Sequence, residues 1–303
     1  QNFDYARNYE MLVRRHVVGP SGIRLQMDVR EADGTTRDQA ANRLIEAAWA
    51  KWGKMGTPTR CGRLSWWSVE CVMATALARE GGAFLRLYRG SARGPFGFQV
   101  EPVPLDLLDL DRTEPLPDGS WIEAGIEFKR DGQVRAYHLW SHPQDEAHRG
   151  RNRERVRVPA RDILQIMIPE EIGQLFGIPR SATALRLMNM AEKYQESALT
   201  AADYGAATMI FFQQEDSAGQ VAAAAATTPP IDEIEAGTMM GLPPGVKPVP
   251  HTPHYPEAAI EPFMRHMAHN QAAGLGVAYE TLTADLSRAN FSSLRAGKGE
   301  ERE

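Results

Sequence analysis

The chain has 303 residues, of which 43 % are apolar and 24 % are charged, a composition typical of a globular protein with one large domain or two smaller ones. Its 34 Lys and Arg against 39 Asp and Glu give a formal charge of −5, which argues against tight binding to nucleic acid, since proteins that grip phosphates are usually basic. No apolar run approaches the roughly 18 residues of a membrane span, no signal peptide opens the chain, and both ends look like fragments of something longer.

The first eighty residues contain three apolar patterns of helical spacing. They predict helices over 3–18, 37–52 and 64–80, with a strand over 23–27 and with Gly81-Gly82 ending the third helix. Four of the six tryptophans, at positions 49, 52, 66 and 67, lie on these helices. Stacking on single-stranded nucleic acid would interleave such rings with basic residues, so their spacing favours burial in the core.

A strand-rich region follows. Short apolar segments predict strands over 83–89, 97–102, 124–128 and 134–140. The turn at 130–133 predicts that the last two pair as a hairpin. The polar residues 141–155 are expected to form an exposed loop.

The C-terminal half contains two helical patterns separated by a long insert. Residues 181–205 give the longest pattern, about 37 Å at 1.5 Å per residue, and its many alanines favour close packing against neighbouring helices. The second helix is expected over 257–273. Between them, an apolar strand over 209–212 leads into an Ala-rich stretch and a segment, 229–253, that holds seven of the 20 prolines and cannot be a regular helix. An insert of roughly 50 residues is far longer than an ordinary connection, which indicates a functional module.

Histidine pairs and a glycine turn are weak candidates for chemistry. His266 and His269, like His251 and His254, are three residues apart but lack a third ligand, so we interpret them as polar surface residues. The turn 274–276 has neither a preceding strand nor a following Lys-Ser/Thr, so a helix C-cap is the better interpretation than a phosphate site.

Two cysteines and three aspartates are the remaining candidates for metal binding or other chemistry. Cys61 and Cys71 form no CxxC pattern and are expected to be free buried thiols in a reducing compartment. Asp106, Asp109 and Asp111 lack the Gly and Glu of an EF-hand loop and are expected on a solvated strand edge. No nucleophile motif is present in the sequence. The sequence therefore predicts no catalytic residue, no cofactor and no metal.

Five groups of motifs follow one another along almost the whole chain. They lie at 17–24, at 125–127 with 131–138, at 158–164, at 173–179 and at 274–285 with 290–295. The most distinctive is Gly173-Gln174-Leu175-Phe176-Gly177-Ile178-Pro179. Together and in this order they resemble the lambda-like family of double-stranded DNA phage portal proteins.

The resemblance marks eight motif positions as structural: Gly173, Gln174, Gly177, Pro179, Gly276, Tyr279, Ser292 and Ser293. Three positions depart from the family's usual pattern. Ala284 stands where the family has glycine, Phe291 where it has tyrosine, and Gln165 where a histidine often follows Asp-Ile-Leu. These departures affect no catalytic role, because the family has none.

The resemblance implies an α+β portal fold with an α/β wing, a two-helix stem and a small β/loop clip. The implied parts are the wing over 1–180, the first stem helix over 181–208, the clip over 209–256, the second stem helix over 257–275, and the tunnel loop with the start of a returning wing helix over 276–303. The C-terminal crown expected of the family is absent from this sequence.

The resemblance also implies a non-enzymatic role in the virion. Portals form a ring, twelve-fold in the assembled particle, at one capsid vertex through which DNA is packaged and ejected. The implied partners are further copies of the chain, passing double-stranded DNA, the terminase large subunit, head–tail adaptors, scaffold and major capsid protein. No membrane is implied, and assembly would take place in the host cytoplasm.

Charge along the chain suggests where DNA would pass. The 181–205 helix has a net charge of −1, whereas 283–298, where portals carry the tunnel loop, has +2. Arg288, Asn290 and Arg295 are therefore expected to touch the genome transiently, or alternatively to pair with acidic groups of a neighbouring subunit.

Two other classes of function stay open on the sequence alone. One is another non-enzymatic connector such as a head–tail adaptor, although adaptors are usually shorter. The other is a metal-dependent hydrolase built on the histidine pairs, for which neither a third ligand nor a general base can be nominated.

Overall fold

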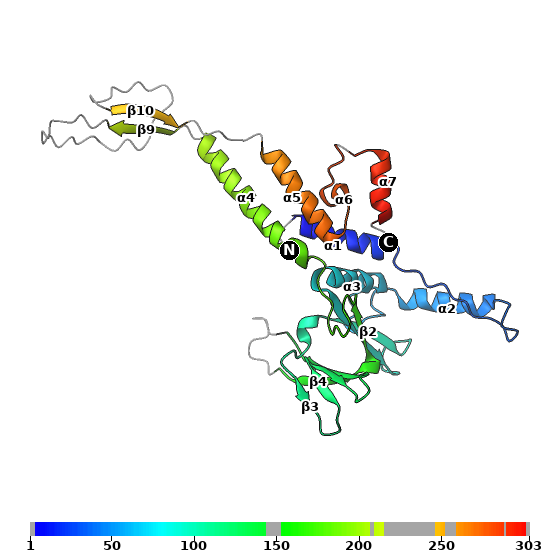
Figure 1. The fold of residues 1–303 in the computed structure, drawn as a ribbon. Helices are drawn as coiled ribbons and strands as arrows, with labels where there is room; N and C mark the ends of the chain where they lie inside the picture. Colours follow the sequence, from blue (N-terminus) through cyan, green and yellow to red (C-terminus); the bar gives the residue numbers. More distant parts are fainter. Residues whose placement is uncertain are drawn as a thin grey trace. The chain divides into compact units, whose positions relative to one another are not determined.

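The structure, a computed structural model, describes residues 4–143, 153–206, 209–214, 246–251, 259–287 and 289–300. The chain divides into two compact units. Gln1–Met188 with Ala268–Glu303 form the first, named here the α/β unit, and Asn189–Met267 form the second, the helix–hairpin unit. Figure 1 labels their helices and strands.

Three helices open the α/β unit, as the sequence predicts. α1 spans Asp4–Val17, α2 Gln39–Trp52 and α3 Trp66–Glu80. The side chains of Asp38 and Ser65 accept hydrogen bonds from first-turn N–H groups of α2 and α3, which have no partner inside a helix. Gly81, at φ +82°, ends α3 in the left-handed region that favours glycine.

The strand predicted over 23–27 is wrong. This segment belongs to no β-ladder. The N–H of Met27 donates to the Glu46 carboxylate at 3.0 Å, and the N–H of Val29 donates to the Asn42 side chain at 2.7 Å. Because α2 supplies these acceptors, the segment needs no neighbouring strand.

Two antiparallel sheets of the α/β unit lie below α3 (Figure 1). The three-stranded sheet has the order β2-β1-β8, from Phe98–Val103, Gly82–Arg89 and Ile163–Met167. The five-stranded sheet runs in chain order through β3 (Glu114–Pro115), β4 (Trp121–Glu123), β5 (Ile126–Phe128), β6 (Val134–Trp140) and β7 (Arg155–Pro159). Short 3₁₀ turns at Leu105–Leu107 and Ala160–Asp162 join the two sheets.

The predicted strands are confirmed with one shortening. β5 and β6 pair as the predicted hairpin. β5 begins at Ile126 and not at 124, because Ala124 and Gly125 have positive φ values of 47° and 79°. The exposed loop predicted over 141–155 is too long at its end, since Arg155 already belongs to β7, and residues 144–152 lie outside the described residues.

The main core cluster combines side chains of both sheets. Its buried members are Phe84, Val103, Leu108, Ile126, Phe128, Tyr137, Leu139, Val158 and Ile163. Phe84 of β1 and Tyr137 of β6 meet edge to face, with ring centroids 5.2 Å apart. The two sheets are thus held together by one apolar layer.

The tryptophans confirm the core prediction at three positions of four. Trp49, Trp52 and Trp66 form a cluster with centroids 4.9–5.4 Å apart, and Trp52 also stacks on Phe98 of β2. Trp67 is the exception, since it is 43 % exposed. Its Nε1–H donates to the Gly19 carbonyl, so the ring lies on the surface over the end of α1.

The helices and the strand predicted in the C-terminal half are confirmed. α4 spans Ala182–Ala206 and α5 Ile260–Leu275, and β9 (Met209–Gln214) pairs antiparallel with β10 (Val246–His251). Two prolines of the predicted Pro-rich segment lie in β10; as an edge strand it can lack the N–H groups of Pro248 and Pro250. Two short helices, α6 (Tyr279–Thr283) and α7 (Phe291–Glu300), close the chain.

Candidate functional site

The distinctive motif at 173–179 forms a loop after β8, named here the signature loop (residues 168–179). Gln174 organises it, because its side-chain oxygen accepts the N–H groups of Glu170 (2.6 Å) and Glu171 (3.1 Å). Its side-chain amide donates to the Phe176 carbonyl. Gly173 has φ +80°, and Ile172 before it is fully exposed. One glutamine therefore fixes a loop that presents an apolar side chain to solvent.

Gln165 anchors the far side of the signature loop. Its side-chain amide donates to the Leu175 carbonyl at 2.7 Å, and its side-chain oxygen accepts from the Tyr137 hydroxyl at 3.1 Å. Leu175 and Phe176 pack against the core shared by the two sheets. The glutamine that stands in place of the family's histidine therefore has a structural task.

The end of the signature loop starts α4. Gly177 packs against Gly81, and the Pro179 carbonyl accepts the N–H of Ala182 at 2.9 Å. One residue later, the Thr183 hydroxyl donates to the Gly274 carbonyl of α5 at 2.7 Å. The motif thus positions the first turn of α4 against the last turn of α5.

The second motif region, named here the closing segment (residues 274–295), begins with a helix C-cap. Gly276 has φ +69°, and its N–H donates to Ala273 at 3.2 Å. The N–H of Val277 donates to Ala272 at 3.1 Å. These bonds form a Schellman motif, which confirms the C-cap interpretation of 274–276.

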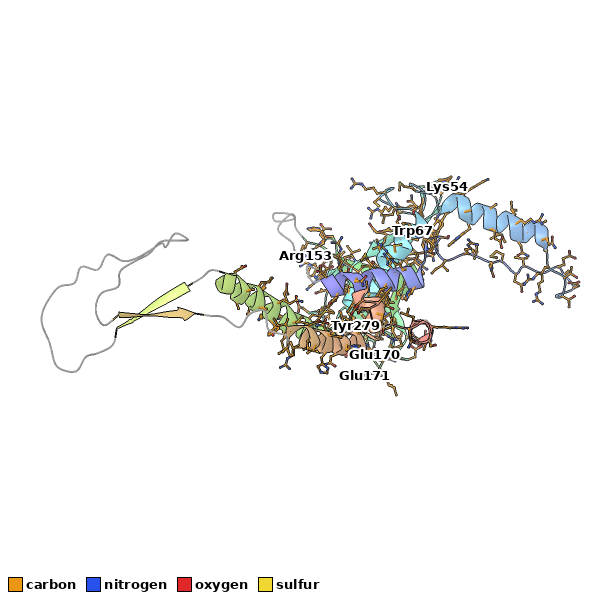
Figure 2. All side chains as sticks on the ribbon, turned by 90° about the horizontal axis from the view of Figure 1, so that it is seen from above. Lys54, Trp67, Arg153, Glu170, Glu171 and Tyr279 are labelled. Carbon is orange, nitrogen blue, oxygen red and sulfur yellow. The ribbon has the colours of Figure 1, made fainter. Side chains whose placement is uncertain are left out.

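Tyr279 is the centre of the closing segment. Its ring stacks on His269 with centroids 3.9 Å apart, and its hydroxyl donates to Asp285 Oδ2 at 3.0 Å. Asp285 Oδ1 accepts the N–H of Ser287 at 3.0 Å. Asn8 of α1 donates to the Leu282 carbonyl at 2.6 Å, and Figure 2 shows Tyr279 beside α1. The segment is therefore held by both neighbouring helices.

Ala284 gives a physical reason for the family's glycine. It has φ +58° and ψ 17°, in the left-handed region where a side chain with a Cβ atom is strained. The hydrogen bonds of Thr283 and Asp285 on either side hold this turn.

The residues expected to face DNA lie at the end of the closing segment. Asn290 and Arg295 are both exposed, and the Asn290 carbonyl accepts the N–H of Leu294 in the first turn of α7. Arg288 lies outside the described residues. Ser292 is exposed, and the side chain of Ser293 is not described. The structure brings Tyr279 and Asp285 together, while contact with DNA stays a prediction.

A buried ionic network on the five-stranded sheet was not predicted from the sequence. Glu127 of β5 is 3 % exposed and accepts two hydrogen bonds from Arg157, at 2.7 and 2.8 Å. Arg135 lies 3.3 Å from it, and His138 Nε2 lies 3.2 Å away. Arg112 contacts the other ring nitrogen of His138 at 2.9 Å. Charged residues alternate with apolar ones along β5, β6 and β7, and this pattern was the available signal for the network. Pairing Glu127 with its arginines also requires the register of the strands, which the sequence does not provide.

The network shifts two pKa values. The hydrogen bonds from Arg157 lower the pKa of Glu127 against the opposing effect of burial, so this carboxylate stays charged. Burial, with the nearby Arg112 charge, lowers the pKa of His138, so the imidazole is neutral at pH 7. A neutral ring can accept from Arg112 at Nδ1 and donate to Glu127 at Nε2.

Two predictions about exposure are wrong, one for Asp109 and one for Cys61. Asp109 is not on a solvated edge: it is 1 % exposed, and Arg155 Nε lies 2.7 Å from its carboxylate, although at an angle too poor for a regular hydrogen bond. Cys61 is exposed, whereas Cys71 is buried, and both thiols are free. Asp109 was misread because its partner follows 46 residues later.

The histidine pairs fall on two elements. His266 and His269 are exposed on α5, as predicted, although His269 carries the ring of Tyr279. His251 ends β10, and His254 lies outside the described residues. Within the described ranges, no three His, Cys, Asp or Glu side chains gather as metal ligands would, and no helix is long and apolar enough to span a membrane.

Comparisons of the sequence agree with the motif positions. The model of a family described as "Phage portal protein, lambda family" matches residues 1–303. A "Probable portal protein" of Halomonas phage phiHAP-1 is 31 % identical over 308 residues, which cover 100 % of this chain and 59 % of the relative. The chain thus spans about three fifths of that relative's length.

Comparisons of the structure agree with the fold class. The structure described as "Neck of empty GTA particle computed with C6 symmetry" has a TM-score of 0.52 at 14 % identity, covering 95 % of this chain and 69 % of that chain. The "Virion of native gene transfer agent (GTA) particle" gives 0.51 at 13 % identity, covering 94 % and 73 %. At such identity the likeness shows a shared fold, and it confirms a mixed α+β architecture.

Proposed function

Because the chain belongs to the lambda family of phage portal proteins, we propose that it is a subunit of the ring at one capsid vertex through which double-stranded DNA is packaged and ejected. Portal proteins are structural and not enzymatic, so the histidine pairs need no hydrolytic role. The match over the whole chain favours a portal over a head–tail adaptor.

The order helix, hairpin, helix is the observation that supports this proposal most. α4 leads into the β9–β10 hairpin, and α5 follows it. We assign residues 1–180 to the wing, 181–208 and 257–275 to the stem helices, 209–256 to the clip, and 276–303 to the tunnel loop and the start of a returning wing helix. The motif contacts at the start of α4 and the end of α5 give the two stem helices a common base.

Apolar side chains on the two stem helices support packing between subunits. Leu185, Met190 and Leu199 of α4 are 51–67 % exposed, and Phe263 of α5 is 44 % exposed. A neighbouring subunit could bury these side chains. A ring of twelve copies would cover these side chains with heterologous contacts.

The channel wall is expected to hold DNA weakly. Each phosphate contact releases a counterion, which strengthens binding to DNA. Many lasting contacts would therefore slow a duplex that has to move through the channel. Within this proposal Arg288, Asn290 and Arg295 of the closing segment face the DNA, since Asn290 and Arg295 are exposed and residues 283–298 have a net charge of +2 in a chain of net charge −5. Pairing with acidic groups of a neighbouring subunit is the competing role.

Each part of the proposed ring subunit is assigned its own binding partners. The clip would bind the terminase large subunit during packaging and head–tail adaptors afterwards, and the wing would meet scaffold and major capsid protein during assembly. The protein would reside in the virion after assembly in the host cytoplasm.

Imaging of the purified chain tests the proposal directly. Negative-stain micrographs should show rings with an axial hole, and light scattering should give the mass of about twelve subunits. A stable monomer at micromolar concentration and physiological salt would contradict the portal ring.

A further inference from the structure

A basic hollow of about 570 Å³ opens beside the C-terminal end of β1. Its rim carries four arginines and a single carboxylate: Arg86, Arg89, Arg93, Arg161 and Asp162. Its wall also includes the half-buried apolar side chains of Leu87 and Pro159. In a chain of net charge −5, this concentration of positive charge is local and unusual.

Two of the four arginines lack an acidic partner. Arg89 pairs with Asp162 at 2.6 Å, and Arg161 lies 3.7 Å from the same carboxylate. Arg86 and Arg93 instead lie over the ring of Tyr88, at 4.9 and 5.2 Å from its centroid, and neither reaches a carboxylate in the described part of the chain. The hollow therefore has positive charge left for an anionic ligand.

The tip of the signature loop carries negative charge. Glu170 and Glu171 are exposed, with no ion pair to any other described side chain, and Ile172 beside them is fully exposed. Figure 2 shows the two glutamates at the margin of the α/β unit. The bonds of Gln174 to their backbone hold the tip in one conformation, which lowers the entropy that binding would cost.

The loop cannot fill the hollow of its own chain. Asp162 of the hollow precedes β8, and the loop follows it, so the five residues Ile163–Met167 separate them by about 17 Å at 3.3 Å per residue. Two different surfaces at opposite ends of one strand are what a head-to-tail contact between identical subunits requires.

We propose that the tip Glu170-Glu171-Ile172 of one subunit docks into the arginine hollow of the next subunit in the ring. This inference rests on the proposed ring. The two glutamates meet Arg86 and Arg93, and Ile172 covers the apolar wall at Leu87 and Pro159. The contact repeats around the ring, and each subunit contributes the loop to one neighbour and the hollow to the other.

A second copy fits the hollow better than DNA does. A phosphate backbone would satisfy the arginines but would leave the apolar wall without a matching group. The tip supplies both carboxylates and an apolar side chain on a rigid loop. Charge pairs of this kind set register and partner choice in an interface.

Charge reversal tests the contact from both sides. Glu170→Arg with Glu171→Arg changes the loop, and Arg86→Glu with Arg93→Glu changes the hollow. Each pair should raise the concentration needed for ring assembly about tenfold or more, measured by light scattering. For the loop variant, the charge-matched control Asp111→Arg with Glu123→Arg, at an exposed turn position and an exposed position of β4, should assemble as the unchanged protein does. Melting temperature and circular dichroism of each variant report whether it folds.

Mixing the two variants gives the decisive result. In a 1:1 mixture the reversed loop meets the reversed hollow, and the unchanged loop meets the unchanged hollow, so alternating rings should form where neither variant assembles alone. Folded variants that form rings alone, or that fail to assemble on mixing, would overturn the contact. Intact rings that lose only DNA retention after the arginine changes would assign the hollow to DNA instead. An unchanged protein that never forms rings would overturn the proposed function as well, and so separates the two failures.

Discussion

Gly81 at the end of α3 and Gly177 in the signature loop touch through their backbones. A Cβ atom at Gly81 would lie 2.5 Å from the Gly177 carbonyl oxygen, and a Cβ atom at Gly177 would collide with the Gly81 carbonyl oxygen. The two glycines are far apart in sequence but adjacent in the fold. Neither position has room for a side chain. This contact fixes where the signature loop crosses the end of α3 before α4 begins.

Gly81→Ala should therefore destabilise the protein strongly. It adds a clash of about 1–3 kcal/mol to the strain of about 1 kcal/mol that alanine suffers at positive φ. Gly132→Ala is the matched control, because Gly132 has φ +83° but no atom within 4 Å of its Cβ position. Equal losses of unfolding free energy in chemical denaturation would show that the close contact has no energetic weight.

Ala284→Gly should stabilise the protein by about 0.5–1 kcal/mol, because glycine removes the strain of a left-handed turn at φ +58°. The control Ala273→Gly, at an exposed position inside α5, should destabilise by about 1 kcal/mol. Thermal unfolding of both variants measures the difference. A lower melting temperature for Ala284→Gly would contradict the strain argument.

The free energy of unfolding should rise as the pH increases from 5 to 7. Burial lowers the pKa of His138 in the folded chain, so the unfolded chain binds a proton more readily and acid favours unfolding. The stability from this group is complete above the ordinary histidine pKa and is lost as the pH falls through the folded value. His138→Gln should flatten this dependence in urea titrations, whereas His16→Gln, at an exposed position on α1, should keep it.

Replacing Arg288 and Arg295 by Gln separates the two roles proposed for them. If they face DNA, the variant should form normal rings but retain less packaged DNA, measured by nuclease protection. If they join neighbouring subunits, the rings themselves should fall apart in light scattering. Arg186→Gln with Lys193→Gln, at exposed positions on α4 outside the closing segment, serves as a charge-matched control.

Replacing residues 217–244 by a short Gly-Ser linker should leave rings intact and abolish terminase binding. The change keeps both strands of the β9–β10 hairpin, so it removes only the segment between them. Replacing 144–152 in the proposed wing by the same linker should leave terminase binding unchanged in pull-down assays. Retained binding after the first replacement would refute the assignment of the clip.

Helices were predictable here because their signals are local. α2 and α3 carry an N-cap, an apolar stripe and a stop within about fifteen residues. β3 and β4 were missed because they have only two and three residues, too few for an alternating pattern. The 23–27 segment failed for another reason, since its hydrogen-bond acceptors are side chains of α2 that no local pattern reveals.

The sequence motifs predicted which residues of the site are structurally important, but not which residues they contact. The motifs marked Gly177 and Tyr279 as structural, but the residues they touch, Gly81 and His269, are distant in sequence or were assigned to the surface. The burial of Glu127 likewise depends on arginines of two later strands.

The cluster of Trp49, Trp52 and Trp66 gives the protein an intrinsic optical probe. Indole rings about 5 Å apart couple electronically, so their transitions should split into a pair of circular dichroism bands of opposite sign. The part of the signal that involves Trp66 exists only while α2 and α3 are packed together, because Trp49 and Trp52 lie on α2 and Trp66 lies on α3. Trp52 also donates to the Phe98 carbonyl of β2, which holds this cluster against the sheet. Assembly of this corner of the fold can thus be timed spectroscopically, without a label and without altering a residue.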